Sequence, residues 1–201
     1  MKVLFLGCHC DDIELGCGAT IHKHKNDWDI YCSVFCSQGY KDGSLHFISD
    51  ISAKALKHLG AKHLEFSTFA PDCFHTQRQQ ILELLMNLKK TIEPKIIFVN
   101  NSDEHQDHET LYKESIRVFR QDTLLTYPVC RSQRSFCPNT FEQVSIEDVN
   151  IKLESARMYK GFYGAKNYFN EDNLLASLRS NGIYFNAEFA EVYKTITRVG
   201  V

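Results

Sequence analysis

Six histidines and aspartates in two short segments have the residue types and the spacing of a catalytic metal site. They are His9, Asp11 and Asp12 in the segment CHCDD, and His105, Asp107 and His108 in the segment DEHQDH. Catalytic zinc takes three protein ligands of this kind and leaves a fourth position open for water. That water loses a proton near neutral pH, so a carboxylate that does not bind the ion can act as the base. Two adjacent aspartates can fill these two roles, one as a metal ligand and one as the base, because neighbouring side chains in a loop or first helical turn point in different directions.

Each segment also has a purely structural interpretation. Asp11 and Asp12 are placed to cap a helix at 14–26, where the helix dipole favours carboxylates. The segment 103–108 equally fits a solvated turn before a helix at 109–120. The functional interpretation is favoured only if the two segments meet at matching ends of one sheet.

The chain alternates short apolar strands with helices. The pattern predicts strands at 2–7, 29–37, 63–66 and 95–100, and helices at 14–26, 49–60, 76–94 and 109–120. After residue 121 it weakens and indicates strands at 124–129 and 140–146 and a helix at 146–159. Unbroken apolar strands between helices predict an α/β fold, with a mostly parallel sheet and helices on both faces. We expect one domain over residues 1–201, since ~100–200 residues per domain is usual.

This fold predicts a meeting point for the two polar segments. Ligands bind outside the carboxyl ends of the strands in open parallel sheets. CHCDD follows the strand at 2–7, and DEHQDH follows the strand at 95–100. If these strands are neighbours, both segments face one crevice, which turn-rich loops at 38–48 and 130–140 are expected to shape.

The sequence composition argues against binding to nucleic acids, insertion into a membrane and export from the cell. A formal net charge of −2 lacks the basic excess of a nucleic-acid-binding surface. No stretch approaches the ~18 uncharged apolar residues of a membrane span. Asp11 and Asp12 interrupt the apolar start before an export cleavage site, so we expect a cytoplasmic protein whose eight cysteines are reduced. The oligomeric state stays open between a monomer and a homo-oligomer.

Two other groups of residues are interpreted structurally. The segment GCGATI at 16–21 lacks the last glycine of a dinucleotide-binding loop and lies well past the strand end. Its glycines are better explained by close packing of the helix on the sheet. The remaining histidines are expected to be solvated or capping residues: His22, His24, His46, His58, His63 and His75.

Four segments, in order along nearly the whole chain, resemble the LmbE-like, or PIG-L, N-acetylglucosamine deacetylases. HCDDIELGCGATI at 9–21 resembles the first signature of that family, and DEHQDH resembles the second. KLESARMY at 152–159 and YFNAEFAEVY at 184–193 are similar to two weaker elements. The resemblance implies a three-layer, Rossmann-like fold and removal of an acetyl group from an acetylated amino sugar.

The resemblance also implies roles for the six residues. Zinc would be held by His9, Asp12 and His108, and Asp11 would be the general base. His105 would stabilise the developing oxyanion, and Asp107 would orient His105. The protonated Asp11 would then return its proton to the departing amine.

The chain departs from the family pattern at a few positions. Cys10 and Gln106 replace prolines, Ile13 replaces a glutamate, and Ile48 and Ile51 replace the arginine and glutamate of an Arg-x-x-Glu motif. The missing arginine is expected to bind substrate, so its absence weakens any inference about the sugar. Lys41 or Lys54 could replace this arginine in binding substrate, although each is explained more simply as a solvated surface lysine.

Three hypotheses follow from these residues. The first is a zinc-dependent hydrolase that deacetylates a small molecule, a 2-acetamido sugar or its conjugate. The second is a non-catalytic sugar- or nucleotide-binding module, motivated by the departures from the pattern. The third is a metal-dependent phosphohydrolase, although three ligands for one ion argue against a two-metal site.

Overall fold

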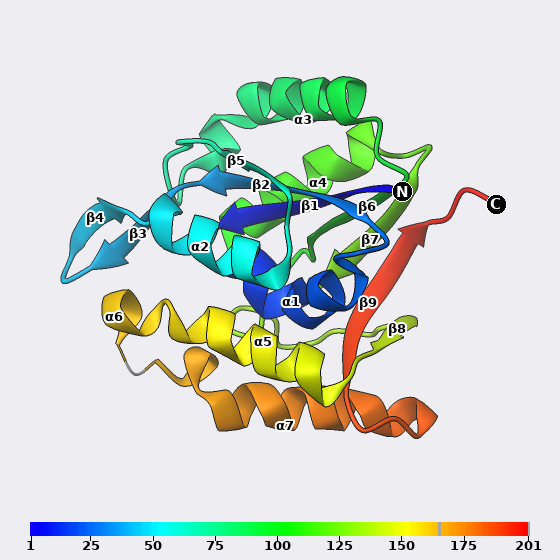
Figure 1. Cartoon of the computed structure of the whole chain (residues 1–201). Helices are drawn as coiled ribbons and strands as arrows, with labels where there is room; N and C mark the ends of the chain where they lie inside the picture. The colour runs from blue at the N-terminus through cyan, green and yellow to red at the C-terminus, as the bar shows by residue number, and fades with distance from the viewer. Residues whose placement is uncertain (165, 201) are drawn as a thin grey trace.

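The computed structural model describes residues 1–164 and 166–200, and within them seven strands form one sheet in the order β5-β2-β1-β6-β7-β9-β8 (Figure 1). The strands are β1 (Lys2–His9), β2 (Asp29–Cys36), β5 (His63–Phe66), β6 (Ile96–Asn100), β7 (Thr123–Tyr127), β8 (Thr140–Gln143) and β9 (Ala190–Thr197). Strands β5, β2, β1, β6 and β7 run parallel, and β9 is antiparallel to both β7 and β8. The predicted mostly parallel sheet is confirmed.

Helices cover both faces of this sheet, which gives three layers (Figure 1). The helices are α1 (Asp12–His24), α2 (Ser49–Leu59), α3 (Arg78–Ile92), α4 (Gln106–Val118), α5 (Ile146–Arg157), α6 (Lys160–Tyr163) and α7 (Glu171–Gly182). Helices α3 and α4 pack on one face, and α1, α2 and α5 pack on the other, with α7 against α5 and β9. Short 3-10 turns lie at Phe74–Thr76, Asn167–Phe169 and Ile183–Phe185. Within the described residues, no helix is long and apolar enough to cross a membrane.

Strand β1 shows why its sequence is apolar throughout. Val3 and Phe5 belong to the core on the α1 side, whereas Leu4 and Leu6 belong to the core on the α3 side. All four side chains are fully buried. Successive side chains of a strand point to opposite faces, so a strand covered on both faces needs an apolar residue at every position.

Helix α1 follows β1 directly and packs very close to the sheet. A Cβ atom at Gly16 would overlap the ring of Tyr127, whose hydroxyl donates a hydrogen bond of 2.7 Å to the carbonyl oxygen of Leu6. The glycine therefore allows the close approach of helix and strand, as the sequence predicted for this segment.

A buried ion pair also holds α1. Lys152 of α5 pairs with Glu191 of β9 and donates to the carbonyl oxygen of Leu15 at 2.5 Å. Glu191 accepts the backbone N–H groups of Ala19 and Thr20 at 3.1 and 2.8 Å. The pair thus joins three elements that are distant in sequence, and it includes the two family-like segments near the carboxyl end of the chain.

The structure differs from the sequence predictions in three places. The expected loop at 38–48 contains a hairpin of β3 (Gln38–Lys41) and β4 (Ser44–Phe47), closed by Asp42 and Gly43 with φ of 52° and 78°. Helix α7 and strand β9 were not predicted. His22 is neither solvated nor a cap: it is buried, with Nδ1 2.7 Å from Asp148.

All eight cysteines are free thiols, and five of them are buried.

Candidate metal centre

The two polar segments meet at one edge of the sheet, as predicted. Strands β1 and β6 are parallel neighbours, with Leu6 opposite Val99. His9 is the last residue of β1, His105 is the N-cap residue of α4, and His108 lies in the first turn of α4, the helix that follows β6 in the chain. The imidazole rings of His9, His105 and His108 gather within 4.7–5.3 Å of one another, measured between centroids.

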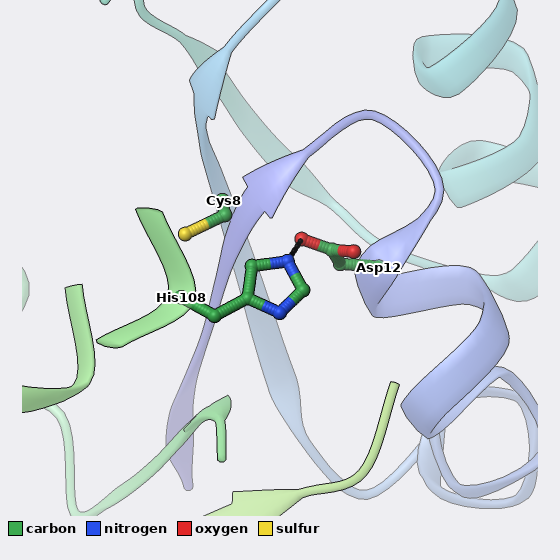
Figure 2. A group of neighbouring side chains, drawn as sticks. All are labelled: Cys8, Asp12 and His108. Carbon is green, nitrogen blue, oxygen red and sulfur yellow. Dashed lines mark ion pairs between the residues drawn. The ribbon is translucent and has the colours of Figure 1, made fainter. Parts of the chain in front are cut away.

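Three of the predicted residues bring one ligand atom each to a common point. His9 Nδ1 lies 3.6 Å from Asp12 Oδ2 and 3.3 Å from His108 Nε2, and His108 Nε2 lies 3.3 Å from Asp12 Oδ2. Figure 2 shows the Asp12 carboxylate facing the His108 ring. Zinc ligands at about 2.0–2.2 Å from a tetrahedral ion lie about 3.3–3.6 Å apart. The set of His9, Asp12 and His108 therefore fits zinc in both chemistry and spacing.

Two overlapping groups of possible ligands are less suitable. Cys8 lies near Asp12 and His108, but burial raises the pKa of its thiol far above the ordinary value, which disfavours the thiolate that binds metals. His105 and Asp107 form a group with His9, but Asp107 faces the other nitrogen of His9, Nε2, and His105 accepts a backbone hydrogen bond from Asp107. This arrangement fits residues that orient His9 as a metal ligand better than it fits a second metal site.

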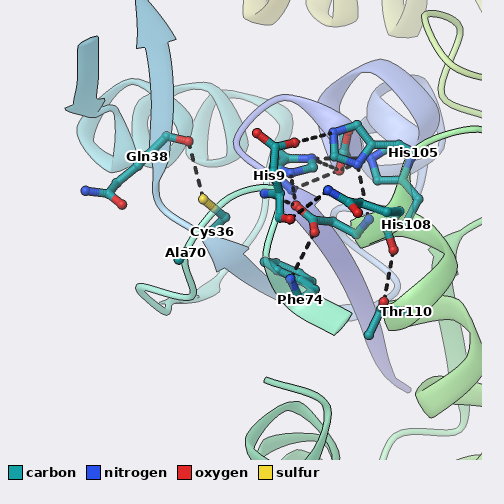
Figure 3. A network of polar contacts seen from close by, with 12 residues as sticks. His9, Cys36, Gln38, Ala70, Phe74, His105, His108 and Thr110 are labelled. Atoms are coloured by element: carbon teal, nitrogen blue, oxygen red, sulfur yellow. Dashed lines mark hydrogen bonds and ion pairs between the residues drawn. The ribbon is translucent and has the colours of Figure 1, made fainter. Parts of the chain in front are cut away.

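A carboxylate holds the far nitrogen of each candidate histidine ligand. Asp107 Oδ2 lies 3.2 Å from His9 Nε2, and Asp103 Oδ2 lies 2.7 Å from His108 Nδ1. Such partners fix the tautomer and the orientation of a metal-binding imidazole. Asp107 accepts the backbone N–H groups of Asp72 and Phe74 at 2.7 and 3.1 Å, and Figure 3 shows Phe74 in this network.

Asp103 contacts the candidate metal centre, although the sequence predicted no role for it. Its carboxylate contacts His108 and also accepts a hydrogen bond of 2.6 Å from the hydroxyl of Ser132. Its position five residues before His108 was visible in the sequence. The contribution of Ser132, which follows β7, had no local signal.

His105 is oriented differently from the prediction. The Asp107 carboxylate was expected to orient it, but that carboxylate contacts His9 instead. The backbone N–H of Asp107 donates to His105 Nδ1 at 3.2 Å, which leaves the ring proton on Nε2. Burial, with the nearby charges of His9 and His108, lowers the pKa of His105 and favours this neutral form.

Asp11 occupies a strained position beside the candidate ligands. Its φ is 123°, a value that side chains other than glycine rarely adopt, and strain of this kind is concentrated at functional sites. It precedes α1, but its side chain makes no capping hydrogen bond, so the capping interpretation is wrong for this residue. The side chain is buried and lines the cavity described below. Burial and the neighbouring Asp12 carboxylate raise the pKa of Asp11.

The electrostatics of the centre favour a cation. Burial by itself would raise the pKa of Asp12. The charges and hydrogen bonds of His108 and His9 outweigh it, so the pKa of Asp12 lies well below its ordinary value. Burial opposes protonation of His108, yet Asp12 and Asp103 raise its pKa to about 9. The negative charge of these buried carboxylates favours the protonated imidazoles, and it would likewise favour a bound metal cation.

A cavity of about 380 Å³ opens onto these residues. Gln38, Gly39 and Tyr40 from one predicted loop and Arg131 and Ser132 from the other line it, which confirms that both loops shape the cavity. Other lining residues had no signal in the sequence, among them Asp72, Tyr163, Lys166 and Tyr168. Neither Lys41 nor Lys54 lines this cavity, and Ile48 is buried in the core.

The fold and the gathered imidazoles and carboxylates define an α/β protein with a candidate catalytic metal centre. The family model for GlcNAc-PI de-N-acetylase, PIG-L, matches residues 4–119, more than half of the chain. The chain therefore belongs to the PIG-L, or LmbE-like, family of deacetylases.

Individual relatives agree with this assignment. The chain is 29% identical over 167 residues to the uncharacterized deacetylase YaiS of Escherichia coli, which covers 79% of this chain and 90% of that protein. The structure resembles N,N'-diacetylchitobiose deacetylase from Pyrococcus horikoshii, with a TM-score of 0.79, 19% identity and coverage of 97% and 83% of the two chains. It also resembles GalB, the 4-carboxy-2-hydroxymuconate hydratase of Pseudomonas putida, with a TM-score of 0.76, 14% identity and coverage of 100% and 98%. At these identities the two structures show a common fold alone.

Proposed function

We propose that this protein is a zinc-dependent hydrolase that removes the N-acetyl group from a 2-acetamido sugar or its conjugate. The observation that carries the proposal is the spacing of 3.3–3.6 Å among the ligand atoms of His9, Asp12 and His108. The buried Asp11 lies directly beside them in sequence and lines the same cavity. The deacetylase activities named for YaiS and for the Pyrococcus enzyme support the reaction class.

His9, Asp12 and His108 would hold the zinc ion, and Asp107 and Asp103 would keep the two imidazoles in the orientation for binding it. When bound, zinc supplies Lewis acidity, which lowers the pKa of water and polarises a carbonyl group. Asp11 is then the carboxylate left free for proton transfer.

The remaining residues divide the hydrolysis of the amide between them. Asp11 accepts a proton from the water that attacks the acetamide carbon. His105 donates its Nε2–H to the carbonyl oxygen as negative charge develops there, because the backbone N–H of Asp107 holds the other ring nitrogen as an acceptor. The C–N bond breaks as Asp11 returns the proton to the leaving amine, and the products are acetate and the amino sugar.

The two other hypotheses have less support. A module that only binds a sugar has no need of a strained, buried Asp11 beside a complete set of candidate ligands. A two-metal phosphohydrolase requires a second set of ligands, and His105 and Asp107 are engaged with backbone groups and with His9.

Acetate release tests the proposal directly. The purified protein, stripped of metal and then reloaded with zinc, is offered a panel of N-acetylated amino sugars and matched sugar phosphates. We expect acetate from at least one acetylated sugar, only after reloading, with one zinc per chain. Release of phosphate instead, or failure to bind stoichiometric zinc, would remove the proposed function.

A further inference from the structure

Asp103, the carboxylate behind His108, is held entirely by donors from the protein. Its side chain is 0% exposed. Its Oδ2 atom lies 2.7 Å from His108 Nδ1 and accepts a hydrogen bond of 2.6 Å from the hydroxyl of Ser132. Its Oδ1 atom accepts the backbone N–H of His105 at 2.8 Å. Loss of one of these donors would leave a buried acceptor unsatisfied, which is costly.

Ser132 belongs to a turn that is joined to the segment after β6. Its backbone N–H and that of Gln133 donate to the carbonyl oxygen of Val129 at 3.2 and 3.0 Å. Its own carbonyl oxygen accepts the backbone N–H of Glu104 at 3.4 Å, and Asn101 donates to the side chain of Gln133 at 2.9 Å. A serine side chain has a single χ angle with staggered rotamers, so this fixed backbone limits where its hydroxyl can lie.

The same turn lines two cavities. Val129, Arg131 and Ser132 line the cavity of about 380 Å³ at the candidate metal centre. Arg131 also lines a second cavity, of about 630 Å³, together with Gln133. The turn that supplies a donor to Asp103 is therefore part of the surface that faces a ligand.

We propose that Ser132 is a positioning residue of the metal centre, whose hydroxyl orients Asp103 and, through it, His108. This inference rests on the proposed function, which assigns His108 as a zinc ligand. Behind the other histidine ligand, Asp107 is held by backbone N–H groups, which no substitution removes cleanly. A side-chain hydroxyl can be removed, so the contribution of the turn to metal binding is open to measurement.

A direct contact between Ser132 and substrate is the competing role, because this residue also lines the cavity. The hydrogen bond of 2.6 Å to Asp103 favours the positioning role, since it already engages the proton of the hydroxyl. The two roles differ in what loss of the hydroxyl changes. A positioning residue alters the affinity for zinc, whereas a substrate contact alters KM.

Three single variants and one double-mutant cycle test the inference. S132A removes the hydroxyl and S132T retains it. S135A is the control, an exposed serine of the same loop that contacts Gln133 through its backbone carbonyl. The cycle combines S132A with D103A. The affinity for zinc is measured by competition with a chelator, and urea denaturation checks that each variant is folded.

We expect S132A to bind zinc about 3–10-fold more weakly than the wild type, less than the ~10–100-fold typical for loss of a direct partner of a metal-binding imidazole. S132T and S135A should match the wild type. S132A should have no further effect when D103A is already present, because the hydroxyl acts through that carboxylate. Unchanged affinity in S132A, an equal loss in S132T, or a full effect of S132A in the D103A background would overturn the inference.

Acetate release is followed in parallel, so that the two proposals can fail separately. Weaker zinc binding by S132A supports the positioning role even if no acetylated sugar is hydrolysed. Normal zinc affinity with a raised KM in S132A would assign Ser132 to substrate binding and leave the deacetylase proposal standing. A wild-type protein that binds no zinc contradicts both proposals.

Discussion

At the scale of single residues, the three imidazoles of the centre differ in the group that contacts their second ring nitrogen. His9 and His108 each have one nitrogen facing Asp12 and the other facing a carboxylate, Asp107 or Asp103. His105 has no carboxylate behind it and is oriented by a backbone N–H. This difference separates candidate ligands from a candidate hydrogen-bond donor.

Replacement of Asp11 tests the proposed base. We expect D11N to bind zinc normally and to lose a factor of about 10²–10⁴ in kcat, with KM little changed, because an amide cannot accept the proton. Steady-state acetate release and metal analysis provide the measurements. D72N, which removes another carboxylate from the same cavity, should lose far less. Full activity in D11N would exclude Asp11 as the base.

Replacement of Asp107 distinguishes the two roles considered for it. Because its carboxylate contacts His9, we expect D107N to weaken zinc binding by about 10–100-fold. Activity at saturating zinc should be largely retained, since the Asp107 backbone that orients His105 is unchanged. Zinc affinity is measured by competition with a chelator. Normal affinity combined with a large fall in kcat would instead support the role predicted from the sequence.

At the scale of elements, helix α1 determines where Asp11 and Asp12 lie. It is fixed by the contact of Gly16 with Tyr127 and by the buried pair of Lys152 and Glu191. Both contacts come from segments more than 100 residues away, so the geometry of the centre depends on the carboxyl-terminal half of the chain.

Loss of one member of the buried pair should therefore be costly. We expect K152M to reduce the free energy of unfolding by about 3–5 kcal/mol, because Glu191 is left buried with an uncompensated charge. Urea denaturation followed by circular dichroism measures the change. K23M breaks an exposed pair with Glu142 and should cost less than about 1 kcal/mol. Similar costs for the two variants would show that the buried pair does not hold α1.

The elements also show what the sequence could predict. The strands of the main sheet and the helices up to residue 120 were predicted from their apolar patterns and from marked ends, such as Gly60 at the end of α2. The hairpin of β3 and β4 was missed although Asp42 and Gly43 are typical of its turn. Strand β9 was missed because it includes the polar residues Glu191 and Lys194, and the ion pair that allows Glu191 to be buried exists only in the folded protein.

At the scale of the whole molecule, the parallel pairing of β1 and β6 unites segments about 90 residues apart. The sequence predicted this meeting of the two polar segments on the condition that their strands are neighbours, which the structure confirms, and the family resemblance singled out His9, Asp12 and His108 among their residues. The cavity-lining residues Tyr163, Lys166 and Tyr168 were not predictable, because their positions depend on tertiary contacts of short segments. The candidate chemistry could thus be read from the sequence, whereas the substrate-facing surface required the fold.

The same architecture predicts how metal removal affects the protein. The two apolar cores do not include the candidate ligands, so the metal-free protein should remain folded. Zinc at about 1,000 times its dissociation constant should add about 4 kcal/mol of stability, which is about 10 °C in Tm for a chain of this size. Thermal denaturation with chelator and with zinc measures the shift, which should vanish in H108A and persist in H58A, whose histidine pairs with Glu154 at the surface. Complete unfolding by the chelator at 25 °C would indicate a structural metal, because the apolar cores would then be insufficient without it.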